Sequence, residues 1–265
     1  MSDIENQIPV KEQIALNNDS SFVPASVTKI KTEGDYIQFG HEKYLKSELV
    51  DAFGGDFNPG LSPPPKHDLA NPSPLGLSAF ALTTFVLSLI NLEARGVTIP
   101  NVVVGLAFFY GGATQLVAGM FEIAVGNTFG GVGLSSYGGF WCAWAAFYVE
   151  SFGISAAYTD EREFHFAVAI FLLGWFIFTF FLMLLTLKST VAFFSIFFFL
   201  SITFLLLAIA DFQNSVPVKK AGGVFGLLTA FAAWYNAYAG LANKQNSYVT
   251  VKAIPLPDLE GKKYK

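Results

Sequence analysis

The segment Phe166–Leu187 reads FAVAIFLLGWFIFTFFLMLLTL, 22 residues without a charged side chain. A helix that crosses the hydrocarbon core of a bilayer takes about 20 residues. The apolar character continues on both sides, because the 138 residues from Leu75 to Phe212 carry only ten charged side chains. Soluble domains are about one quarter charged, so this stretch would lack a polar surface in water. The sequence therefore predicts an all-α polytopic membrane protein.

Six apolar segments are long enough to be transmembrane helices. They are Leu75–Leu92, Val102–Val125, Tyr137–Ala157, Phe166–Leu187, Val191–Phe212 and Gly222–Ala242. An even number of spans places both tails on one side of the membrane. The lysines and arginines of the two sides are tied in number, but the long N-terminal tail has no export signal, so we expect both termini in the cytosol.

The chain is expected to have three parts. Residues 1–70 are polar and rich in proline and predict a mostly disordered cytosolic tail, in which His41–Phe53 has the spacing of a short surface helix. Residues 71–243 form the six-helix transmembrane domain. Residues 244–265 form a short cytosolic C-terminal tail.

Several function classes are disfavoured by composition. The formal net charge is −4 and there is no basic block, so the chain lacks the footprint of a nucleic-acid-binding protein. The single cysteine, Cys142, cannot form an intrachain disulfide, and His41, His67 and His165 do not have the spacing of metal ligands. Because no nucleotide-binding or hydrolase motif is present either, we expect neither an enzyme nor a protein with a metal or cofactor.

The motif Asn71-Pro72-Ser73-Pro74-Leu75-Gly76-Leu77 stands directly before the first span. We expect Asn71 to cap this helix, with Pro72 at its start, where a missing N–H is not needed. The free N–H groups and the positive end of the helix dipole would then favour a small anion at the membrane entrance. The motif also fits a helix that simply begins there, and the residues alone favour that interpretation.

Polar residues share one face of the first expected helix. Phe80, Thr84, Ser88 and Asn91 are spaced by four, four and three positions. Such a stripe suits a wet path or hydrogen bonds between helices, and both interpretations stay open. Phe80 stands where a hydrophobic gate would narrow the path.

Two polar residues share a face of the second expected helix, Gln115 and Glu122. A carboxylate within a span is costly and is a functional candidate by default. Glu122 is expected to carry a proton or to filter anions, and the alternative is an interfacial residue tied to a neighbouring backbone. Gln115 offers a donor and an acceptor nearby.

Other polar and aromatic residues are given structural interpretations first. Asn236 lies on a stripe of small residues, which favours close helix packing, although it could also contact a substrate. Glu150 and Asp211 are expected to mark helix boundaries. Phe193 and Phe197 are expected to face lipid or a second subunit.

Ordered motifs along the chain resemble the acetate transporter family, which includes bacterial succinate–acetate permeases and fungal acetate and ammonia-export proteins. The signature Asn-Pro-Ala-Pro-Leu-Gly-Leu is matched at 71–77, with Ser73 in place of alanine. Further matches are Phe108–Gly112 with Gln115 and Glu122, Gly126–Gly130, Ser136–Trp141, Thr186–Lys188 and Leu207–Ile209. The resemblance covers about residues 70–243, and the long N-terminal tail is similar to the fungal branch.

The resemblance implies a ring-shaped homohexamer of six-helix protomers in the plasma membrane, each with its own path. A hydrophobic constriction is implied at Phe80, Tyr137 and Leu200. The implied substrates are acetate and related small monocarboxylates, with succinate as a further candidate, carried as anions or together with protons. The remaining path residues are expected to be Asn71, Pro72, Leu75, Thr84, Ser88, Asn91, Gln115, Glu122 and Asn236.

Two other functions stay open. The fungal relatives suggest export of ammonium or ammonia. A membrane sensor of acetate that acts through its N-terminal tail is the alternative from another class. For the location, Lys262 and Lys263 have the spacing of an endoplasmic-reticulum retrieval signal, which is a minor alternative to the plasma membrane.

Overall fold

The computed structural model describes residues 30–52 and 69–257. These residues belong to two compact units, one on each side of the junction between His67 and Asp68. The first unit is a small sheet with one short helix. The second is a bundle of long helices.

The N-terminal unit contains three antiparallel strands in the order β1-β2-β3, followed by a helix. The elements are β1 (Ile30–Glu33), β2 (Tyr36–Phe39), β3 (Glu42–Leu45) and α2 (Lys46–Ala52). Gly34 and Gly40 make the two turns with positive φ angles of 56° and 63°, which glycine adopts without strain.

Residues 30–52 of the expected tail form β1, β2, β3 and α2, and the expected helix over His41–Phe53 begins only at Lys46. Residues 42–45 pair with β2 instead, because the glycine turn at Gly40 returns the chain along that strand. The rest of the expected tail, 1–29 and 53–68, lies outside the described residues.

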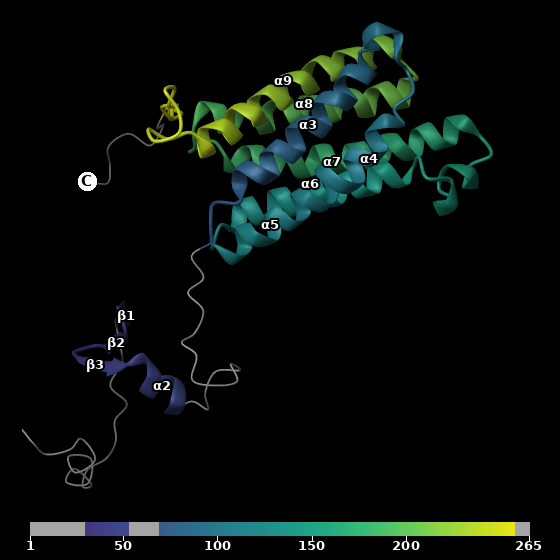
Figure 1. Cartoon of the computed structure of the whole chain (residues 1–265). Coiled ribbons are helices and arrows are strands. Elements are labelled where there is room, and N and C mark those ends of the chain that lie inside the picture. Colours follow the sequence, from purple (N-terminus) through teal and green to yellow (C-terminus); the bar gives the residue numbers. More distant parts are fainter. Residues whose placement is uncertain (1–29, 53–68, 258–265) are drawn as a thin grey trace, which may run out of the picture. The chain divides into compact units, whose positions relative to one another are not determined.

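The second unit is built from long helices joined by short turns (Figure 1). The helices are α3 (Ser73–Asn91), α4 (Val102–Phe108), α5 (Gln115–Ala124), α6 (Thr128–Ala146), α7 (Glu161–Leu185), α8 (Val191–Gln213) and α9 (Val216–Leu241). The shorter segments are η1 (Ala94–Gly96), η2 (Phe109–Thr114), η3 (Glu150–Phe152) and η4 (Ser155–Ala157). The segment η2 is a π-helical stretch that joins α4 to α5 into one long helix.

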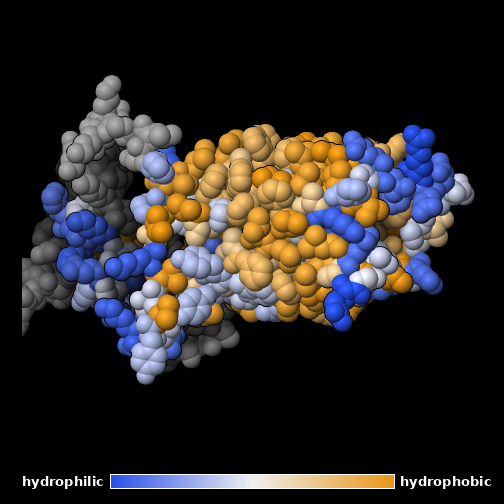
Figure 2. Space-filling view, turned by 90° about the horizontal axis from the view of Figure 1, so that it is seen from above, coloured by the Kyte–Doolittle hydropathy of each residue, from blue (hydrophilic) through white to orange (hydrophobic). Residues whose placement is uncertain are grey.

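Five helices of the described residues are long and apolar enough to cross a membrane. They are Ser73–Asn91, Val102–Ala124, Glu161–Leu185, Val191–Gln213 and Val216–Leu241. The visible face of the helical unit is a hydrophobic band, with hydrophilic residues at the end that carries the α3–α4 and α6–α7 connections (Figures 1 and 2). Five of the six predicted spans thus coincide with these helices.

The third predicted span, Tyr137–Ala157, is misplaced by about two and a half to three turns. The helix observed there, α6, has 19 residues and begins at Thr128. The Asn127 side chain caps it by accepting a hydrogen bond from the Gly130 N–H at 3.0 Å. Glycine is a poor helix former in general, so the glycine-rich stretch after Asn127 resembled a loop. Residues 147–160 form turns and the short segments η3 and η4, with a positive φ of 66° at Gly153.

Glycines allow the helices to approach one another closely. The Cβ atom of an alanine at Gly138 on α6 would lie 2.8 Å from the Leu116 backbone nitrogen on α5. A Cβ atom at Gly226 on α9 would lie 2.2 Å from the Ser88 hydroxyl on α3. Packing through small residues is the usual way in which helices associate in lipid. Helix α3 therefore packs against α9, and α5 packs against α6.

The ends of the helical unit come together at one end of the bundle. A Cβ atom at Gly240, close to the end of α9, would lie 2.8 Å from the Pro74 ring at the start of α3. The chain after α9 then crosses the turn between α7 and α8, where the Val191 N–H donates to the Ile254 carbonyl at 2.9 Å. One end of the bundle thus holds the beginning of α3, the end of α9 and the C-terminal segment.

The glycine packing predicts a contrast between two neighbouring residues of α6. Gly138→Ala should lower the free energy of unfolding by about 1–3 kcal/mol, because the added methyl group overlaps α5. Gly139→Ala is the matched control, because nothing lies within 4 Å of a Cβ atom there and alanine favours the helix. Thermal unfolding of both variants in detergent measures the difference. Equal stability of the two variants would contradict the packing described here.

Candidate functional site

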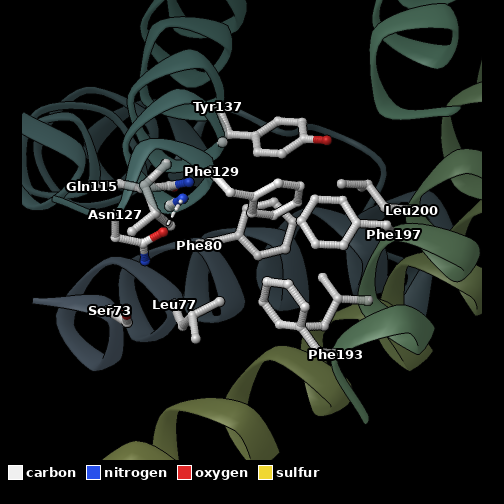
Figure 3. A pocket seen from close by; sticks show the side chains of 14 residues that line it. Ser73, Leu77, Phe80, Gln115, Asn127, Phe129, Tyr137, Phe193, Phe197 and Leu200 are labelled. Atoms are coloured by element: carbon white, nitrogen blue, oxygen red, sulfur yellow. Dashed lines mark hydrogen bonds between the residues drawn. The ribbon is translucent and has the colours of Figure 1, made fainter. Parts of the chain in front are cut away.

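A cavity of about 300 Å³ lies among α3, α6 and α8, at the end of the bundle where α3 begins. This cavity, called here the near cavity, has mostly apolar walls with a few polar groups, as small-molecule sites usually have. It is lined by Ser73, Leu77, Phe80, Gln115, Asn127, Phe129, Gly130, Gly133, Leu134, Tyr137, Phe193, Ile196, Phe197 and Leu200 (Figure 3).

The structure brings Phe80, Tyr137 and Leu200 together in the wall of the near cavity, from three different helices. Each is at most 4% exposed. The ring centroids of Phe80 and Tyr137 lie 5.7 Å apart. The Tyr137 hydroxyl is hydrogen-bonded to Thr179 Oγ1 on α7 at 2.9 Å, which fixes the ring. The three apolar side chains thus lie together in one wall of the near cavity.

Gln115 is a polar group without a protein partner in the near cavity. Its side chain is fully buried, and neither its Oε1 nor its Nε2 atom has a hydrogen bond. A buried unpaired polar group costs about 1–3 kcal/mol. The residue follows η2, and π-helical turns are frequent at functional sites. The amide therefore presents a free donor and a free acceptor to a small molecule in the cavity.

Glu122 lies behind the cavity wall and is held by two residues that line it. Its side chain is 1% exposed. The Ser73 hydroxyl donates to Oε1, and Asn127 Nδ2 donates to Oε2 at 2.5 Å. The expected alternative, a bond to a neighbouring backbone, is not what the structure shows. The carboxylate instead ties the start of α3 and the cap of α6 to the end of α5.

The start of α3 differs from the expectation by one residue. Pro72 is the residue before the helix, and Asn71 Oδ1 accepts a hydrogen bond from the Ser73 N–H at 3.1 Å. Asn71 and Leu75 are exposed, and neither they nor Pro72 line the near cavity. The helical spacing explains this, because Ser73, Leu77 and Phe80 occupy the face turned to the cavity.

The polar stripe of α3 continues beyond Phe80. Thr84 and Ser88 are buried, and the Thr84 hydroxyl has no hydrogen-bond partner. Asn91 reaches a second cavity of about 320 Å³, called here the far cavity. Phe80 and Asn91 are eleven residues apart, which is about 16 Å along a helix. One face of α3 thus runs from the near cavity to the far cavity.

Asn236 does not line the near cavity. Its Nδ2 donates to the Ala192 carbonyl on α8 at 2.9 Å and to the Ala232 carbonyl at 2.8 Å. Both amide hydrogens are therefore used within the protein. The contacts favour the structural interpretation of this residue, a tie between α8 and α9, over contact with substrate.

Sequence reasoning missed part of the cavity wall. Phe193 and Phe197 were expected to face lipid or another subunit, but they line the near cavity. Their spacing from Leu200 puts all three on one face of α8, and this spacing is the signal that could have found them. Asn127 was seen only within a motif, and its contact with Glu122 depends on tertiary structure.

No group of three or more possible metal ligands is found among residues 30–52 and 69–257. The polar groups around the near cavity are hydroxyl and amide groups and one buried carboxylate. This arrangement offers hydrogen bonds to a small polar molecule.

Comparison with known proteins agrees with this architecture. The chain is 55% identical over 251 residues to ammonia transport outward protein 2 of Saccharomyces cerevisiae. The aligned region covers 93% of this chain and 89% of the relative. It is 53% identical over 224 residues to acetate permease A of Emericella nidulans, covering 80% and 75%. The solved structure of the bacterial acetate channel SatP matches with a TM-score of 0.61 and 32% identity, covering 68% of this chain and 96% of that one. Residues 53–258 match the model of the GPR1/FUN34/yaaH family, and the chain therefore belongs to this family.

Proposed function

We propose that the protein moves acetate and related small monocarboxylates across a membrane, through the near cavity and past the neck of Phe80, Tyr137 and Leu200. The observation that carries the proposal is the unpaired amide of Gln115 beside this apolar neck. The similarity to proteins named acetate permease A and acetate channel supports the same substrate class.

The chemistry of the near cavity suits a molecule with one methyl group and one carboxyl group. The aromatic walls accept the methyl group. The Gln115 amide donates to a carboxylate through Nε2, and it accepts the O–H of the protonated acid through Oε1. One side chain therefore accommodates both protonation states, so the cavity is compatible with movement of the anion and with movement together with a proton.

The neck is the main barrier in this scheme. A carboxylate that passes three apolar side chains loses its water, which is costly without compensating hydrogen bonds. The unpaired hydroxyl of Thr84 stands one helical turn beyond Phe80 and offers such a bond. Hydrophobic constrictions of this kind can close by dewetting.

We also propose that α6 is a sixth transmembrane helix, in a homohexameric ring of the plasma membrane with both termini cytosolic. The support for α6 is its length of 19 residues and its close packing against α5. Apolar side chains on the outside of the bundle, such as Ile170, Phe181 and Leu185, suit contact with lipid or with neighbouring subunits. The hexamer itself rests on the family resemblance.

Ammonium or ammonia is the second candidate substrate. The aromatic rings of Phe80, Phe129, Phe193 and Phe197 surround the near cavity (Figure 3), and such rings attract cations. The similarity to ammonia transport outward protein 2 supports this possibility. Competition in the assay of labelled-acetate exchange described below distinguishes the two substrates. Inhibition by propionate and not by ammonium indicates a carboxylate path, whereas inhibition by ammonium and not by propionate indicates an ammonium path.

The role of Gln115 predicts a loss of transport without a loss of stability. Gln115→Met keeps the length of the side chain but removes both polar groups, so exchange of labelled acetate in proteoliposomes should fall about tenfold, the effect of one lost hydrogen bond. Thermal stability should stay the same or rise, because the unpaired amide is removed.

The matched control is Met120→Leu, which changes an outward-facing side chain of the same helix and should leave exchange unchanged. Wild-type exchange by Gln115→Met, measured above empty liposomes, would rule out the proposed contact between this amide and the substrate.

The neck predicts a change in substrate size. Phe80→Ala should increase acetate exchange several-fold and admit butyrate, because the aromatic ring no longer narrows the path. Phe85→Ala is the control on the same helix, since Phe85 packs against Phe231 and Trp234 of α9. Exchange of both acids is measured with each variant in proteoliposomes. An identical size preference in the wild type and Phe80→Ala would contradict the assignment of the neck.

A further inference from the structure

The far cavity concentrates ionisable side chains at the opposite end of α3. It is formed where the ends of α3, α6 and α8 meet the starts of α7 and α9. Its polar lining includes Asn91, Tyr148, Glu150, His165, Asp211 and Lys219. In the near cavity, by contrast, the lining residues carry no charge. The charges of the far cavity have no part in the scheme described so far.

A histidine–aspartate pair connects two helices in this cavity. His165 Nδ1 on α7 lies 3.0 Å from Asp211 Oδ1 on α8. Both side chains remain partly exposed, at 33% and 25%, so water and small ions can reach them. The expectation that Asp211 marks a helix boundary is incomplete, since α8 continues to Gln213 and the Asp211 carboxylate faces His165.

The other groups around His165 make its surroundings negative. Glu161, on the same helix, has its carboxylate 4.0 Å from Nε2. Glu150 and Asp211 add two carboxylates from η3 and α8, and Lys219 of α9 contributes one positive charge. The carboxylates therefore outnumber the lysine when the imidazole is neutral.

The phenol of Tyr148 adds no charge to this balance. Burial, together with the charge of Asp211, raises the pKa of Tyr148 to about 12. The phenol therefore stays protonated and can donate a hydrogen bond into the far cavity.

We propose that the His165–Asp211 pair is a proton-binding site that controls the entry of carboxylates into the far cavity. The proposal rests on the transport function inferred above. A proton on His165 removes one unit of net negative charge from the cavity, and a carboxylate then meets less repulsion. Histidine is the side chain that ordinarily changes charge between pH 5 and 8. Transport through the far cavity should therefore increase as the pH falls through that range.

The test is the pH dependence of labelled-acetate exchange in proteoliposomes with equal acetate and equal pH on both sides. Exchange by empty liposomes is subtracted at each pH, because acetic acid crosses the lipid directly. The wild type should exchange about tenfold faster at pH 5.5 than at pH 7.5, the scale of effect that local charge has on ion access. His165→Gln should lose this difference in rate between pH 5.5 and pH 7.5. Asp211→Asn should raise the rate at pH 7.5, because the substitution removes one negative charge from the far cavity.

The matched control is His41→Gln in the turn between β2 and β3, which should keep the wild-type profile. A wild-type pH step in His165→Gln would overturn the proposal. If the pair were only a structural contact between α7 and α8, His165→Gln would change the exchange rate by the same factor at every pH. The rise in rate between pH 7.5 and pH 5.5 would then persist.

A second measurement does not depend on transport. The chain has three histidines, so the imidazole NMR signal that disappears in His165→Gln identifies this residue in the intact protein in detergent. The proposal requires this signal to shift with pH over the same range in which exchange changes, and to shift differently in Asp211→Asn. A signal that does not move overturns the proposal. A titrating signal in a protein that exchanges no acetate would instead contradict the transport function.

Discussion

A carboxylate buried in a helical bundle has to be held by hydrogen bonds, and this constraint organises the end of the bundle where α3 begins. Glu122 meets it through Ser73 at the start of α3 and Asn127 at the cap of α6. Breaking one of these hydrogen bonds would leave a buried acceptor without a partner, which costs about 1–3 kcal/mol. Three helix ends are therefore locked in one arrangement, and the two partners of the carboxylate become part of the wall of the near cavity. The family signature at the start of α3 is thus tied to the site through a side chain that does not itself line the cavity.

Helix α3 divides its surface between structure and path. Ser73, Leu77 and Phe80 line the near cavity, whereas Pro74 and Ser88 pack against glycines of α9. The unpaired amide of Gln115 lies in the wall of the same cavity as Phe80. Substrate binding at this point would use polar groups that folding leaves unsatisfied.

The sequence predicted what depends on hydrophobic length and missed what depends on tertiary contact. Spans such as Phe166–Leu187 were located to within a few residues, and the resemblance to the acetate transporter family is confirmed by the family match. The start of α6 was missed because its glycines weaken the local helix signal while serving the packing against α5. The strands of residues 30–45 are only four residues each. The pairings of Glu122 and Asp211 join residues 49 and 46 positions apart and could not be read from local patterns.

The most direct test of the path along α3 uses bromoacetate, an acetate analogue that alkylates a thiol with loss of bromide. Cys142 is the only cysteine in the sequence, so Cys142→Ala provides a background in which Thr84→Cys and Phe85→Cys each carry one thiol. Mass spectrometry measures carboxymethylation in proteoliposomes. The thiol at position 84 should be labelled, acetate should slow this labelling, and the thiol at position 85 should stay unlabelled. Equal labelling at both positions, or labelling at 84 that acetate does not slow, would contradict a carboxylate path along this face of α3.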